Sequence, residues 1–241
     1  TVRELQQRID EMQPQRLDDR ALPTHPARAP LLAEAALRRG SSFTVRGSQS
    51  LALALLAQAS SSGLWCAAIG CSGFGAEAAA ALGIALDRCV LVPEPRGHEL
   101  ALLGLLSEAF TVVALRTSGR VRPGDAERVS ARLREHGAAL VVMGDWPRPE
   151  SALTVTASRW SGLGQGAGLL DARELTVRSQ DRRGSRQHTV RFSYDGISSA
   201  SALPRPAQHA PLASGAEPAQ HRARGSARGS ARGAARELVA L

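Results

Sequence analysis

Strand-like apolar runs alternate with helix-like stretches over much of this chain. The runs are near-continuous in Ala, Val, Leu and Ile, as in strands that are buried on both faces. Parallel strands need crossover connections, and helices usually supply them. The pattern therefore predicts an α/β fold with three layers, helix, sheet and helix. The predicted strands span residues 42–45, 64–70, 88–94, 110–116 and 138–144, and the predicted helices span residues 48–59, 76–82, 98–109 and 124–136.

Three further strand-like segments follow without intervening helices. They span residues 152–158, 172–180 and 187–194. The last two flank the turn-like sequence DRRGSR, and this spacing predicts a C-terminal β-hairpin beside a mostly parallel sheet. We therefore expect residues 31–197 to form one core domain. Residues 198–241 are rich in Ala, Gly, Ser, Pro and Arg and predict a disordered basic tail.

The two terminal segments supply candidate partner-binding residues. Residues 1–30 predict a helix followed by a Pro-rich linker, and the helix has one narrow apolar stripe. That stripe fits packing on the protein's own core and docking on another subunit about equally well. In the tail, arginine recurs at every fourth position before a short apolar end. The candidates are Leu5, Ile9, Met12, Arg224, Arg228, Arg232, Arg236, Leu238 and Leu241.

A turn after the first predicted strand resembles a phosphate-binding P-loop, but the chain contains no lysine. All 30 of its Lys+Arg residues are arginine. A working P-loop places a lysine ammonium on the β- and γ-phosphates and a Ser or Thr hydroxyl on magnesium. Here Gly47 is followed by Ser48 at the lysine position and by Gln49 and Ser50. The loop therefore predicts a degenerate nucleotide site.

Several phrases, taken in order, resemble a known family. The phrases are "LPTHPA", "RRGSSFTVRGSQSLALALLA", "GLWCAAIG", "GFGAEAAAALGI", "RLREHGAALVVMGDWP" and "SRWSGLGQGAGLL". Over about residues 20–195 the chain is similar to the RecA-type ATPase core and, more narrowly, to the ImuA/ImuA-prime family. These are RecA-like accessory proteins of bacterial damage-induced mutagenesis cassettes.

The resemblance implies a non-catalytic adaptor in DNA repair. Such proteins bind an inactive Y-family polymerase homologue, ImuB, and act through it with an error-prone C-family polymerase. The set copies past DNA lesions after the SOS response to DNA damage. The resemblance thus implies a cytoplasmic protein that joins the nucleoid at damage, and DNA is a further candidate partner. No apolar run reaches the roughly 20 residues that span a membrane.

At most positions that match RecA's functional residues, this chain carries a residue of a different chemical type. The carboxylate that binds magnesium falls near Arg116, and the catalytic glutamate falls near Ser72 or Gly73. The two DNA-binding loops are short as well. The resemblance therefore implies a pseudo-ATPase with no catalytic residue, bound metal or cofactor.

The net charge of +8 favours an anionic partner. Arginines cluster on the predicted hairpin, where they suit DNA phosphates and a solvated hairpin tip about equally well. These candidate DNA-binding residues are Arg182, Arg183, Arg186 and Arg191.

Two alternative functions remain open from the sequence. One is an atypical ATPase that uses Arg46 in place of the lysine, and the other is an independent DNA-binding module. Asp145 follows a predicted parallel strand and is interpreted as a turn carboxylate. Three cysteines in or near strands are expected to be buried free thiols.

Overall fold

The computed structural model describes residues 20–162, 169–193 and 196–200. Its strands are β1 (Ser42–Arg46), β2 (Cys66–Ile69), β3 (Cys89–Val92), β4 (Val112–Arg116), β5 (Ala139–Met143), β6 (Ser151–Ser161), β7 (Ala172–Asp181), β8 (Gly184–Ser193) and β9 (Gly196–Ala200). Its helices are α2 (Gln49–Ser61), α3 (Ala76–Ala81), α4 (Glu99–Ala109) and α5 (Pro123–His136), with short 3-10 turns η1 (Ala29–Leu31) and η2 (Leu86–Arg88).

The strands form one mixed sheet in the order β3-β2-β4-β5-β1-β6-β7-β8-β9. Neighbours from β3 through β6 are parallel, and β6 to β9 pair in antiparallel fashion. This confirms the expected α/β class, the mostly parallel sheet and the C-terminal hairpin, and the arrangement is compatible with a RecA-like layered fold. Strand β9 was not predicted from the sequence; it crosses the expected domain boundary at residue 197 and ends at Ala200.

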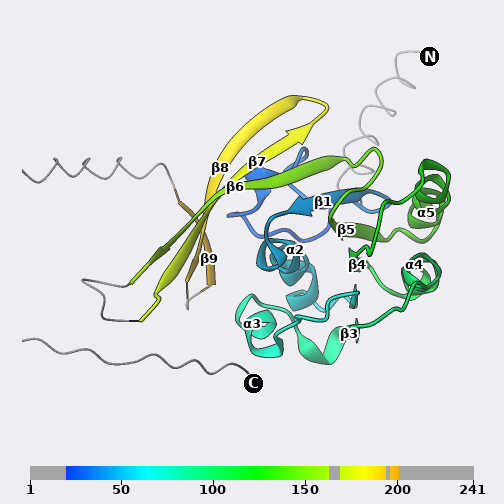
Figure 1. Cartoon of the computed structure of the whole chain (residues 1–241), viewed down its shortest axis with the longest axis horizontal. Coiled ribbons are helices and arrows are strands. Elements are labelled where there is room, and N and C mark those ends of the chain that lie inside the picture. Colours follow the sequence, from blue (N-terminus) through cyan, green and yellow to red (C-terminus); the bar gives the residue numbers. More distant parts are fainter. Residues whose placement is uncertain (1–19, 163–168, 194–195, 201–241) are drawn as a thin grey trace, which may run out of the picture. The chain divides into compact units, whose positions relative to one another are not determined.

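Each central strand sends alternate side chains into two separate apolar layers. In β2, Cys66 packs toward α2, whereas Ala67 packs toward α4 and α5. The four residues of β2 and the five of β5 are all buried, because helices cover both sheet faces. Helix α2 lies on one face and helices α4 and α5 on the other, as Figure 1 also shows.

Local signals explain where the helices begin and end. Ser48 caps α2, because its hydroxyl accepts a hydrogen bond from the Leu51 backbone N–H at 3.1 Å. Helix α5 begins with Pro123, whose fixed φ suits the first helical turn. It ends at Gly137, which adopts the left-handed φ of 66° that favours glycine.

Residues 20–30, expected to belong to a linker, instead pack against the core. Leu22 is 2% exposed, and its backbone N–H donates to the Leu37 carbonyl at 2.7 Å. Arg28 is also buried and donates to the Ala54 carbonyl on α2. Burial lowers the pKa of Arg28 to about 10, so it stays charged at neutral pH. The prolines of this segment indicate turns, but two of its apolar side chains, Leu22 and Ala27, are buried against the core.

The cysteines confirm the expectation of free thiols. Cys66 and Cys71 are fully buried and Cys89 is half-buried. Burial raises the pKa of the Cys66 thiol to about 12 and that of the Cys71 thiol to about 11. Both therefore remain protonated thiols at neutral pH, which makes them poor nucleophiles. In the described part of the chain, no helix is long and apolar enough to cross a membrane.

We expect mild acidification to lower the free energy of unfolding, because of His25 and His188. Partial burial, together with Arg28 near His25 and Arg186 near His188, lowers both pKa values below the ordinary 6.5. The fold therefore favours neutral imidazole. Stability should be complete above pH 6.5 and fall as pH drops through 6.5 toward the lowered pKa values.

Urea unfolding at pH 7.5 and 5.5 checks this expectation against the double variant His25→Asn/His188→Gln. The wild type should lose stability over that interval, and the double variant should lose less. Equal losses in the two proteins would show that other groups control the pH dependence.

Candidate functional site

The chemistry-bearing side chains collect at the carboxyl edge of the parallel strands and at their amino edge. Strands β1, β2, β4 and β5 all run in one direction, so their last residues lie along one edge. That edge holds the P-loop-like turn and Arg116. In open α/β sheets, ligands usually bind at this edge.

At the carboxyl edge the P-loop-like turn is occupied by its own contacts. Gly47 has a φ of 87°, and the Ser48 hydroxyl is used as the α2 cap. The Gln49 side-chain N–H donates to the Gly73 carbonyl at 3.1 Å. Arg116 donates to the Gln49 side-chain oxygen at 2.8 Å. The structure thus brings together residues that the sequence assigned to a degenerate nucleotide site.

A hollow of about 430 Å³ remains beside this cluster. It is lined by Val45, Arg46, Gly47, Ser48, Gln49, Arg116, Met143 and Gly144. Two guanidinium groups line it, and none of these lining residues offers a carboxylate that could ligate magnesium. The hollow can attract an anion but lacks the ordinary means of holding a metal-bound triphosphate.

Arg46, the candidate lysine substitute, forms an ion pair with Asp145. The two side chains are 57% and 70% exposed, so this pair is solvated. Both line a neighbouring hollow of about 700 Å³, together with residues 117–121 of the short loop after β4. Asp145 therefore serves as the counter-charge of Arg46, in keeping with its interpretation as a turn carboxylate.

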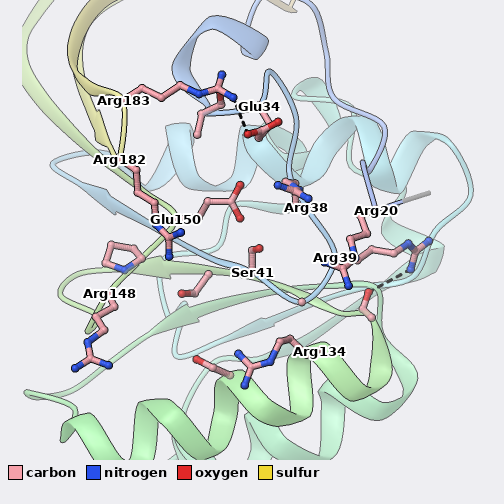
Figure 2. Close-up of a pocket in the computed structure, with 16 residues that line it drawn as sticks. Arg20, Glu34, Arg38, Arg39, Ser41, Arg134, Arg148, Glu150, Arg182 and Arg183 are labelled. Carbon is pink, nitrogen blue, oxygen red and sulfur yellow. Dashed lines mark hydrogen bonds and ion pairs between the residues drawn. The ribbon is translucent and has the colours of Figure 1, made fainter. Parts of the chain in front are cut away.

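A third, more strongly charged hollow lies at the amino edge of the sheet. Its volume is about 600 Å³. We call it the arginine hollow, because it is lined by Arg20, Arg38, Arg39, Arg134, Arg148, Arg182 and Arg183, with Glu34 and Glu150 as the acidic residues. Figure 2 shows Arg38, Arg134 and Arg182 around Ser41, the residue just before β1.

Topology explains why these arginines meet. Residues 38–41 lead into β1, the end of α5 leads into β5, and residues 148–150 lead into β6. The tip of the β7–β8 hairpin reaches the same edge because Ser151 at the start of β6 pairs with Asp181. At Gly40 a Cβ would meet the Arg134 side chain at 3.0 Å, so glycine permits the close approach of α5.

The four candidate DNA-binding arginines of the hairpin separate into two pairs. Arg182 and Arg183 line the arginine hollow. Arg186 instead pairs with the buried carboxylate of Asp181. Arg191 pairs with Asp171 at 3.4 Å and with Glu174 at 3.7 Å. The structure therefore does not gather the four into one cluster.

Other members of the arginine hollow were missed by sequence reasoning. Arg38-Arg39 and Arg182-Arg183 are adjacent pairs just before strands, which is a weak signal that could have linked them. Arg20, Arg134 and Arg148 carry no such signal. The candidate partner-binding residues at both termini lie outside the described residues.

Comparison with known proteins relates the first five strands to an existing family. Residues 30–148 match the family model of the MT3502 N-terminal domain. A curated relative, the "Uncharacterized protein Rv3395c" of Mycobacterium tuberculosis (strain ATCC 25618 / H37Rv), is 31% identical over 109 residues. That alignment covers 44% of this chain and 53% of the relative, so the chain spans about half the length of this curated relative.

Gly70 gives a test of the packing at the carboxyl edge. Its φ is 73°, and an added Cβ would lie 2.6 Å from the Arg116 carbonyl oxygen. Gly70→Ala should therefore destabilise the fold by about 3 kcal/mol, from backbone strain and displacement of β4. In Gly73→Ala the nearest atom to the new Cβ is 3.9 Å away, so the change should stay within about 0.5 kcal/mol.

Urea denaturation of the two variants and the wild type measures this difference. Equal stabilities for Gly70→Ala and Gly73→Ala would contradict the close contact between the loop after β2 and the end of β4.

Proposed function

We propose that this protein is a non-catalytic adaptor with a RecA-like core in a damage-induced translesion DNA synthesis complex. Its partner would be an inactive Y-family polymerase homologue, and through it an error-prone C-family polymerase. The order of sequence phrases supports the family. The observation that carries the non-catalytic role is that, where a P-loop ATPase would hold nucleotide, Ser48 caps α2 and Arg116 donates a hydrogen bond to Gln49.

Each of these contacts removes a requirement for phosphoryl transfer. A serine hydroxyl that caps its own helix does not provide the lysine charge on the transferred phosphate. Arg116 places a positive charge where a carboxylate would hold magnesium, and this repels the metal. A domain with this edge keeps the shape of the fold but lacks the groups that stabilise the transition state.

An adaptor needs an exposed contact surface, and the chain offers three candidates. Two are the terminal segments, residues 1–19 and 201–241. The third is the outer edge of the sheet at β3, which among the described residues pairs with β2 alone. Leu86 and Leu91 there are 43% and 39% exposed, and an unpaired strand edge with apolar side chains suits a partner strand.

Capture by the inactive polymerase homologue tests the adaptor role. We expect the full chain to be retained on the immobilised homologue. Deletion of residues 1–19, deletion of residues 201–241 or the change Leu86→Glu/Leu91→Glu should abolish retention in one case and spare it in the others. The C-terminal deletion keeps β9, so the sheet remains complete. Failure of the full chain to bind would refute the role.

The alternative ATPase reading predicts turnover that depends on Arg46. We expect no ATP hydrolysis above background, with or without DNA, because Arg46 is paired with Asp145 and no lysine exists to replace it. Phosphate release by the wild type and by Arg46→Ala measures this. Turnover in the wild type that disappears in the variant would establish the ATPase and overturn the pseudo-ATPase assignment.

A further inference from the structure

The arginine hollow holds more positive charge than its acidic residues neutralise. Three of its seven arginines have partners. Arg39 donates to the Gly137 carbonyl at 3.2 Å, Arg148 pairs with Glu127 at 3.3 Å, and Arg183 pairs with Glu34 at 2.9 Å. Within the described part of the chain, the side chains of the remaining four make no hydrogen bond or ion pair. These four are Arg20, Arg38, Arg134 and Arg182.

The second acidic residue also lacks a partner. One side-chain oxygen of Glu150 is buried without a hydrogen bond, although the Glu150 backbone N–H donates to the Ser42 carbonyl at 2.7 Å. The backbone contact fixes this residue in place, so Glu150 faces the hollow without neutralising a particular arginine. Figure 2 shows Glu150 and Arg182 in the same part of the hollow, with no interaction drawn between them.

Unpaired guanidinium groups in one hollow favour an anion that bridges several of them. Like charges destabilise one another at short range, and an anion converts that repulsion into attraction. Each guanidinium presents a planar fork of N–H donors that matches phosphate oxygens bidentately. Arginines arriving from five separate segments can contact successive phosphates better than one compact ion.

We propose that the arginine hollow binds the sugar-phosphate backbone of DNA without reading its base sequence. The lining residues include no aromatic side chain on which a base or nucleoside could stack. The only apolar lining residues are Ala33 and Pro149. The hollow therefore has no apolar pocket for the large side chain with which an acidic protein segment would anchor itself. A backbone of phosphates requires neither feature.

The proposal differs from an interface spread over the whole hairpin. Arg186 neutralises the Asp181 carboxylate, which is 1% exposed, and Arg191 is shared between two acidic residues. Only the tip residues Arg182 and Arg183 take part. The proposal is also independent of the adaptor role, because it concerns the amino edge of the sheet and requires no polymerase partner.

A charge-matched pair of variants of the full-length chain tests the site. The pocket variant is Arg38→Gln/Arg134→Gln/Arg182→Gln. The control is Arg122→Gln/Arg159→Gln/Arg178→Gln, whose arginines lie outside the hollow and have no side-chain partner among the described residues. Both remove three charges and no ion pair. Binding is measured by fluorescence anisotropy with labelled single-stranded and duplex DNA over a salt series.

We expect the pocket variant to bind single-stranded DNA at least about tenfold more weakly than the control at moderate salt. Its plot of log K against log salt should be shallower by roughly two units, for three lost phosphate contacts. Equal weakening in the two variants, or absence of binding by the wild type, would overturn the proposal. Polyglutamate that competes as well as unlabelled DNA at equal charge would also overturn it, in favour of an acidic protein ligand.

A variant can lose DNA binding simply because it misfolds. A variant expected to bind DNA more tightly avoids this ambiguity. Glu150→Gln removes a negative charge from the hollow and keeps the shape of the side chain. We expect it to tighten DNA binding roughly threefold, the effect of one charge at several ångströms in a solvated site. Glu77→Gln, on the exposed surface of α3, should leave affinity unchanged. Unchanged affinity in Glu150→Gln would place the DNA elsewhere.

Discussion

Burial of the parallel sheet on both faces is the constraint on which the rest of this structure depends. Strands β2, β4 and β5 have no face open to water along most of their length, so all their side chains except Arg116 are apolar: Ala, Val, Leu, Ile, Met and Cys. In these three strands the one polar side chain is Arg116, the last residue of β4, and the loops that join the strands carry most of the polar side chains around the hollows. Because the strands are parallel, those loops form two opposite edges. The chemistry of the domain is thus divided between these two edges and not spread over the molecule.

The two edges use arginine in contrasting ways. At the carboxyl edge, Arg46 forms a solvated ion pair with Asp145 and Arg116 donates a hydrogen bond to Gln49. At the amino edge, four arginines of the hollow keep their donors free of the described residues. A chain without lysine must use guanidinium for every cationic role, including those for which a compact ammonium is better suited. The P-loop-like turn therefore has arginine side chains beside it that contact Asp145 and Gln49, whereas four arginines at the amino edge have no such contact among the described residues.

Much of the fold could be predicted from particular residues. The apolar runs predicted strands β1 to β8 to within a few residues of their observed bounds. The DRRGSR sequence predicted the hairpin turn, after which β8 begins at Gly184. The short strand β9, which pairs with β8, was missed because GISSA carries little apolar signal. Residues 20–30 were misread as linker because three prolines outweigh Leu22 and Ala27 in composition, although those two side chains are buried. Burial against a distant helix leaves no mark on the local sequence.

The sequence by itself determined the α/β class of the fold, the absence of lysine and the excess of positive charge. Each of these follows from residue type and local spacing. Only the tertiary structure decided that Gln49 would meet Arg116, 67 positions away, and that Arg182 would join Arg38 and not Arg186. The reason is physical: strand order and register, not sequence distance, set which loops share an edge. The direction of each strand in the sheet therefore decides which arginines share an edge, and so which neighbours each of them can contact.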